Sequence, residues 1–352
     1  MNIYLLNMLL TILWGSILLN KNNEHKKMFV CIVSLQLIIL SGLRDISIGA
    51  DTWNYENHFY ELTQFDIYSW KNLFGRFFQF GSYTARDTGY EIVTKLFATL
   101  IPNFRIYLFA IAIFFCWGLG RFLLKHSGNL CLSYVVFESF LLQFFLLTGI
   151  RQTIAVCLTV FWGYDLILNK KLVKYVLLCL IAMTFHTTAI IMLPFYFVCN
   201  CKKNFTGKYL IAIFASALFI IFGSRIFKYI PLGMFSVYAN AQGIASHTFI
   251  FLMLSIVIVV AFLDKTQFLK LIDRNDINII NGTIISEVLI STSAVLDVLF
   301  RLGYYYIFFM LCMIPKILQS FENKSSRIIK IMLYIILVLY VYRMHMEYKF
   351  CF

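Results

Sequence analysis

Three arginines and three proton-accepting side chains lie at the ends of long apolar runs or in the long polar segment 44–103 between two of them. The arginines are Arg44, Arg151 and Arg301, and the proton acceptors are Asp51, Glu91 and His186. A planar guanidinium binds phosphate oxygens in pairs, so arginines suit a diphosphate group. A nearby histidine or carboxylate can take a proton from a hydroxyl. These residue types fit transfer of a group from a lipid diphosphate to a sugar hydroxyl, with the diphosphate as leaving group.

Each of these residues also has a structural interpretation. Arg44 and Asp45 can form a local pair that caps a helix end, and Arg151 can extend to lipid headgroups. His186 can be a buried neutral imidazole. Asp297 and Arg301 are spaced i,i+4 and can neutralise each other. The functional hypothesis therefore depends on all of these residues lying on one side of a membrane.

The composition predicts an all-α polytopic membrane protein. Of the 352 residues, 61% are apolar and 13% are charged, whereas soluble domains are about 45–50% apolar and about 25% charged. A spanning helix needs ~20 apolar residues, so we expect about 10–13 transmembrane helices in one membrane domain, residues 1–352. The net charge of +13 reflects basic residues in short loops that orient helices, and it does not indicate nucleic-acid binding.

The predicted spans alternate from an N-terminus outside the membrane, with no cleavable signal peptide. They are residues 3–19, 28–43, 104–124, 130–148, 152–168, 172–186, 187–199, 208–222, 248–264, 277–297, 302–319 and 328–342. This order puts most basic residues in short inner loops, as the positive-inside rule requires. It leaves one long extracytoplasmic segment, residues 44–103, and assigns every candidate site residue to the outer side.

Two local patterns make further predictions. The apolar run 172–198 is long for one span, so we expect a helical hairpin or re-entrant pair that breaks near His186. Glu91 and Lys95 are spaced i,i+4 and predict a helix-supporting pair.

The nine cysteines are scattered, and the Cys199-x-Cys201 pair alone makes a poor metal site. We therefore expect neither a metal nor a cofactor.

Several motifs, taken in order along residues 40–310, resemble the EpsG family. They are Gly42-Leu43-Arg44-Asp45, Gly49-Ala50-Asp51-Thr52, Tyr55, Gly89-Tyr90-Glu91, Arg151-Gln152, Phe185-His186-Thr187-Thr188-Ala189, and Arg301 with Tyr304 and Tyr305. The resemblance implies a bacterial polysaccharide polymerase of the Wzy type, which makes O-antigen or capsule. Such an enzyme sits in the cytoplasmic (inner) membrane with its active site facing the periplasm or exterior.

The resemblance also implies a reaction and its residues. The growing glycan moves from undecaprenyl diphosphate to the terminal sugar of a new lipid-linked repeat unit. Undecaprenyl-diphosphate-linked oligosaccharide, membrane lipids and a chain-length regulator protein would be the partners. The diphosphate or its glycan would be bound by Arg44, Asp45, Tyr55, Arg151, Arg301 and Tyr305, and the base would be Asp51, Glu91 or His186.

Two other functions have similar sequence requirements. A membrane O-acyltransferase of surface glycans would need a reactive histidine facing the cytoplasmic acyl donor, whereas His186 is assigned outward. A transporter of lipid-linked oligosaccharide would show internal repeats or broken helices in matching halves, and the sequence shows no such symmetry.

Overall fold

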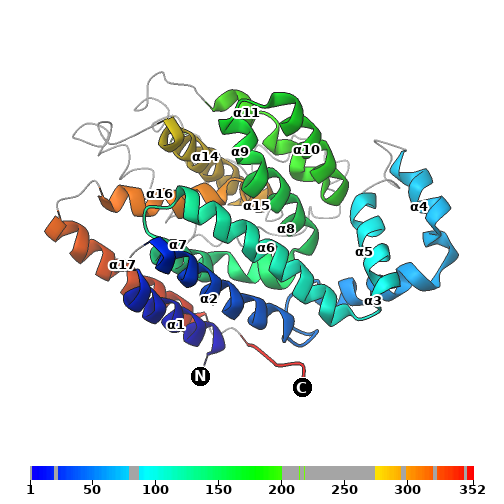
Figure 1. Ribbon diagram of the computed structural model, residues 1–352, viewed down its shortest axis with the longest axis horizontal. Coiled ribbons are helices and arrows are strands. Elements are labelled where there is room, and N and C mark those ends of the chain that lie inside the picture. Colours follow the sequence, from blue (N-terminus) through cyan, green and yellow to red (C-terminus); the bar gives the residue numbers. More distant parts are fainter. Residues whose placement is uncertain are drawn as a thin grey trace. The chain divides into compact units, whose positions relative to one another are not determined.

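Helices account for nearly all of the regular structure in the described part of the chain (Figure 1). The computed structural model describes residues 2–19, 23–78, 87–199, 274–294, 299–319, 323–344 and 347–352, together with Phe214 and Leu218. Within these ranges the only β-type pairing is one isolated bridge between Arg44 and Phe350. The all-α prediction is therefore confirmed for these residues. Asp297, most of predicted span 208–222 and all of 248–264 lie outside them.

The chain divides into two compact units, and each is described by itself. The first unit comprises Met1–Leu193 and Ile331–Phe352, and the second comprises Pro194–Lys330. The prediction of one membrane domain stays a prediction.

The first unit is built from eleven described helices and four short irregular helices. The α-helices are α1 (Ile3–Leu18), α2 (Asn23–Gly42), α3 (Thr52–Gln64), α4 (Trp70–Phe77), α5 (Thr88–Leu100), α6 (Phe104–His126), α7 (Leu130–Phe140), α8 (Ile150–Val156), α9 (Gly163–Leu168), α10 (Leu172–Phe185) and the end of α17 (Asn323–Arg343). The irregular helices are the 3-10 turns η1 (Asp66–Tyr68) and η5 (Thr187–Met192) and the π-helices η3 (Gln143–Thr148) and η4 (Cys157–Trp162).

The second unit contains α11 (Phe195–Val198), α14 (Arg274–Ser291), a 3-10 turn (Thr292–Ala294), α15 (Phe300–Gly303) and α16 (Ile307–Gln319). α14 packs along α15 and α16. The polar face of α14 is buried against these neighbours, and Ser286 donates its hydroxyl to the Gly303 carbonyl at 3.1 Å. Burial of serine and asparagine side chains between helices is typical of packing in membranes.

Two described helices, His25–Gly42 and Phe104–His126, are long and apolar enough to cross a membrane. They match the predicted spans 28–43 and 104–124. Five further apolar helices are shorter than a full span. α17 exposes Ile331, Ile335 and Leu339 along one face, and α6 exposes Ile113 and Trp117. Exposed apolar stripes of this kind fit contact with lipid, because soluble proteins rarely expose contiguous apolar patches.

The predicted break near His186 is confirmed. α10 ends at Phe185, and His186 adopts an extended conformation (φ −153°, ψ 113°). The following 3-10 turn packs back along α10, so that the Tyr175 hydroxyl donates to the Met192 carbonyl at 2.7 Å. The apolar run therefore forms a hairpin, and the turn holds His186.

One end of the first unit gathers both chain termini and the polar stretch that follows α2 (Figure 1). The Tyr4 ring meets Tyr348 edge-on at 5.7 Å, and the Tyr348 hydroxyl donates to the Leu40 carbonyl at 2.8 Å. Arg121 lies near the last turn of α6, far from Phe104, the first residue of that helix. At 1.5 Å per residue, the two residues are about 25 Å apart along the helix axis. The two ends of the unit are thus clearly separated.

Candidate functional site

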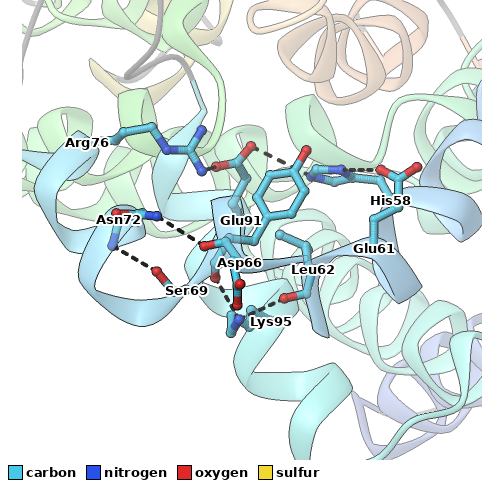
Figure 2. A network of polar contacts seen from close by, with 10 residues as sticks. His58, Glu61, Leu62, Asp66, Ser69, Asn72, Arg76, Glu91 and Lys95 are labelled. Carbon is cyan, nitrogen blue, oxygen red and sulfur yellow. Dashed lines mark hydrogen bonds and ion pairs between the residues drawn. The ribbon is translucent and has the colours of Figure 1, made fainter. Parts of the chain in front are cut away.

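Glu91 lies at the centre of a polar cluster on the segment between α2 and α6 (Figure 2). One of its carboxylate oxygens forms an ion pair with Arg76 at 2.8 Å, and the other lies 3.7 Å from Nε2 of His58. Nδ1 of His58 lies 3.7 Å from Glu61. Arg76 comes from α4, His58 from α3 and Glu91 from the first turn of α5. Three helices therefore supply this cluster.

Burial and charge shift the acid–base properties of the cluster. Burial raises the pKa of Glu91 above its ordinary value, and the positive charges of Arg76 and Arg151 partly oppose that shift. Burial lowers the pKa of His58, and Arg151 lowers it further. His58 is therefore biased toward its neutral form, and Glu91 toward accepting a proton. A carboxylate with a raised pKa is suited to general-base catalysis near neutral pH.

Arg151 lies beside this cluster, between two aromatic rings. Its guanidinium carbon is 5.5 Å from the ring centre of Tyr55 and 5.5 Å from that of Tyr90. Its Nη1 donates to Asp87 at 2.8 Å, while its Nε makes no hydrogen bond in the structure. The Asp87 side chain is 6% exposed and that of Arg151 is 41% exposed. Arg151 is thus held by a buried carboxylate and two rings, with part of its surface open.

A glycine turn fixes α3 next to Arg151. Gly49 has φ +91°, and a Cβ at this position would lie 1.9 Å from the Leu147 carbonyl oxygen. Thr52 donates its hydroxyl to the Ile48 carbonyl and lies 3.0 Å from that of Leu147. Only a glycine fits this approach of the two backbones. The turn starts α3 beside the end of the π-helix that precedes Arg151, which brings Tyr55 over the guanidinium.

Lys95 links α5 to α3, to the turn after α3 and to α4. Its Nζ donates to the Leu62 carbonyl at 2.7 Å and to the Tyr68 carbonyl at 2.6 Å, and lies 5.4 Å from the centre of the Trp70 ring. Figure 2 shows it one turn further along α5, away from the ion pairs of Glu91. The predicted Glu91–Lys95 pair is therefore wrong, because Lys95 satisfies carbonyls at the end of α3 while Glu91 pairs with other helices.

Arg44 is almost fully buried, at 2% exposure. Its Nη1 donates to the Ser41 carbonyl at 2.5 Å and to the Ser41 hydroxyl at 2.8 Å. Its Nε and Nη2 have no hydrogen-bond partner in the structure. Asp45 accepts instead from the Ser47 amide at 3.0 Å, and that contact lowers its pKa. Arg44 and Asp45 therefore do not form the local pair considered for them.

Two of the three predicted base candidates lie in turns. Asp51 precedes α3, and its carbonyl accepts from the Tyr55 amide at 3.0 Å, with no side-chain cap. His186 lies in the hairpin turn, with Nδ1 2.8 Å from the Thr188 hydroxyl. Thr184, just before it, packs against Gly89, so this turn approaches the start of α5. Glu91 is the candidate for which the structure gives direct contacts to other charged site residues.

The remaining two predicted site residues belong to the second unit. Arg301 lies in α15, and Tyr305 lies in the turn after it and is fully buried. Their part in the site stays a prediction.

Sequence reasoning missed three residues of the cluster: His58, Arg76 and Asp87. The available signal was their position in the one long polar segment between apolar runs. Asp87 has φ +57°, a left-handed conformation that is uncommon for a residue other than glycine. Strained residues of this kind concentrate at functional sites.

Neither a characterised protein nor a solved structure matches the sequence at a significant level. The EpsG family matches residues 27–351, which covers the polar cluster, Arg44, the hairpin turn and both units. The match includes all of the motifs on which the resemblance depended. This chain belongs to the EpsG family, the family of Wzy-type polymerases and EpsG-like glycosyltransferases.

Proposed function

We propose that this protein is a polysaccharide polymerase of the bacterial cytoplasmic membrane. It transfers a growing glycan from undecaprenyl diphosphate to the terminal sugar of a new lipid-linked repeat unit. The observation that carries the proposal is the arrangement of Arg151, held between two tyrosine rings, beside the partly buried carboxyl group of Glu91, whose pKa is raised. Family membership supports the same class of reaction.

Each chemical task of the transfer has a suitable group in the cluster. An acceptor hydroxyl attacks the anomeric carbon of the donor glycan, and a new glycosidic bond forms. The bond from that carbon to the diphosphate oxygen breaks, and its electron pair leaves with undecaprenyl diphosphate. In this proposal Glu91 takes the hydroxyl proton, and Arg151 and Arg76 stabilise the charge that develops on the leaving group.

The aromatic residues of the same segment suit glycan binding. Trp53, Phe65, Phe74 and Phe78 are exposed on α3, on α4 and at their ends. Apolar rings of this kind bind the headgroup region of a membrane or stack on sugars. In this proposal the segment faces the exterior, where lipid-linked repeat units are delivered, and about 10–13 helices span the membrane around it.

A deletion strain tests the function directly. Loss of this protein should leave single repeat units on their lipid anchor, with no ladder of longer chains. Plasmid-borne wild type should restore the ladder, whereas Glu91→Gln and Arg151→Lys should not, at equal protein level in the membrane. A normal ladder in the deletion strain refutes the polymerase. A ladder of normal length that lacks acyl groups would identify an O-acyltransferase, and absence of any repeat unit outside the membrane would identify a transporter.

A further inference from the structure

A hollow lined by two arginines and one glutamate lies on another face of α3. Arg44, Ile46, Glu56, Tyr60, Asn103, Phe104, Arg105 and Leu108 line a hollow of about 190 Å³. At ~30 Å³ per water molecule, this volume holds about six waters. It is large enough for a phosphate-sized group, and two arginine residues are among those that line it.

Helix geometry separates this hollow from the Arg151 cluster. Successive residues of an α-helix point about 100° apart, and an α-helix with its side chains is about 10–12 Å across. Tyr55 points to Arg151, whereas Glu56 and Tyr60 line the hollow. One helix therefore presents different faces to two separate groups of cations.

The Arg44 side chain is buried with unused hydrogen-bond donors. It is 2% exposed, and two of its three guanidinium nitrogens make no hydrogen bond in the structure. Backbone hydrogen bonds from the chain end fix the residues around it: the Asp45 amide donates to the Lys349 carbonyl at 2.9 Å, and the Cys351 amide to the Leu43 carbonyl at 3.1 Å. A buried cation with unused donors is unfavourable unless an anion completes it.

We propose that this hollow is a second anion subsite, which holds the diphosphate of the lipid-linked unit that accepts the glycan. The inference rests on the proposed function, because only a polymerase uses two diphosphate-linked substrates at once. The donor reacts at the sugar attached to its diphosphate, so that diphosphate lies beside the base. The acceptor reacts at the sugar farthest from its diphosphate, so its diphosphate binds away from the base. Two cationic sites on different faces of α3 meet both requirements.

Glu56 is the one acidic residue that lines the hollow. Its negative charge opposes an anion. Burial raises the pKa of Glu56, and the nearby Arg105 opposes that rise. Removing this carboxyl should therefore strengthen anion binding, whereas removing Arg105 should weaken it. Opposite effects at two neighbouring residues are specific to an anion site.

Binding of inorganic pyrophosphate to the purified full-length protein tests the inference without any polymerisation assay. In nanodiscs of neutral phosphatidylcholine, equilibrium dialysis should give two sites per wild-type chain. Arg105→Gln should weaken one of them about 10- to 100-fold, as expected for loss of a charged hydrogen bond. Arg44→Lys should act on the same site, Glu56→Gln should tighten it, and Arg151→Gln should affect the other site. Lys174→Gln, an exposed lysine on α10, is the control for loss of one positive charge.

Unchanged binding in Arg105→Gln, or weaker binding in Glu56→Gln, overturns the inference. So does the absence of pyrophosphate binding to wild type at millimolar concentration. A competition experiment identifies the source of the phosphate group: undecaprenyl diphosphate should displace pyrophosphate from the Arg105-dependent site, and phosphatidylglycerol should not. Equal displacement by both lipids would assign the hollow to phospholipid headgroups. The polymerase itself is refuted separately, by a normal ladder in the deletion strain.

Discussion

Replacing Arg151 with alanine should destabilise the protein and abolish polymerisation, and a second substitution at Asp87 should separate the two effects. The Asp87 carboxylate is 6% exposed and forms a 2.8 Å ion pair with Arg151. Removing one partner of a fully buried pair costs ~3–5 kcal/mol. Because Arg151 is 41% exposed, water already reaches the pair, and we expect about 2 kcal/mol. In domains of 150–250 residues that loss lowers the melting temperature by about 4–8 °C.

The double variant Arg151→Ala with Asp87→Asn should regain most of this stability, because no buried negative charge remains. Asparagine is the right replacement, since Asp87 has φ +57° and asparagine tolerates that conformation better than alanine does. Polymerisation should stay about 10²–10³-fold below wild type, as for loss of one group that stabilises a leaving anion.

Thermal unfolding of the purified variants gives the stability, and the length distribution of surface glycan gives the activity. Arg121→Ala is the matched control. Arg121 pairs with Asp165, which keeps Lys125 as a partner, and this cluster lies at the other end of α6. The control should melt close to wild type and polymerise normally. Normal glycan ladders in the double variant would show that Arg151 serves folding alone, and an unrestored melting temperature would show that the Asp87 charge is not the cause of the loss.

Three further changes test other parts of the site. The rate of polymerisation should rise with pH through the pKa of Glu91, because only the carboxylate accepts a proton, and burial raises this pKa. Arg76→Gln removes a positive charge that favours ionisation of Glu91. In pH–rate profiles of membrane vesicles, the rising limb of this variant should therefore lie at higher pH than that of the wild type. Gly49→Ala should prevent stable folding, because the added Cβ would lie 1.9 Å from a backbone oxygen, and the readout is loss of the protein from the membrane. The control Gly75→Ala adds a Cβ with nothing within 4 Å, so it should be neutral or slightly stabilising. Lys95→Met should weaken the packing of α3 and the turn after it on α5 by about 3–6 kcal/mol, because two charged hydrogen bonds are lost. The expected readout is faster amide exchange confined to α3 and that turn, and unchanged exchange would contradict the prediction.

The sequence predicted the features that depend on local rules. The hairpin followed from the length of the apolar run 172–198, which exceeds one span, and the break falls at His186 as expected. Glu91 and Arg151 were singled out from their residue types and positions, and Tyr55 from the resemblance to the EpsG family. The structure brings these three together, because turns at one end of neighbouring helices lie close in space.

The partners of Glu91 could not be predicted in the same way. A pattern rule for helices pairs Glu91 with Lys95, four residues later. In the structure Lys95 turns to carbonyls at the end of α3, and Glu91 pairs with Arg76 and lies close to His58. Those choices depend on how α3 and α4 fold over α5, and their sequence carries no local signal of that arrangement. Burial then raises the pKa of Glu91 and lowers that of His58, and composition cannot reveal either shift.

Backbone geometry, and not neighbouring position in the sequence, decides which groups the Arg44 and Asp45 side chains contact. Neighbours of opposite charge suggested a local pair, but Arg44 forms an isolated β-bridge with Phe350. Successive side chains of extended backbone point to opposite faces. Arg44 therefore points into the protein, while Asp45 turns to the Ser47 amide. The residue that forces this geometry lies some three hundred positions away, beyond the reach of any local pattern. Arg44 thus has no carboxylate partner from Asp45, and two of its guanidinium nitrogens make no hydrogen bond. Because Arg44 also lines a hollow, an anion there is worth testing.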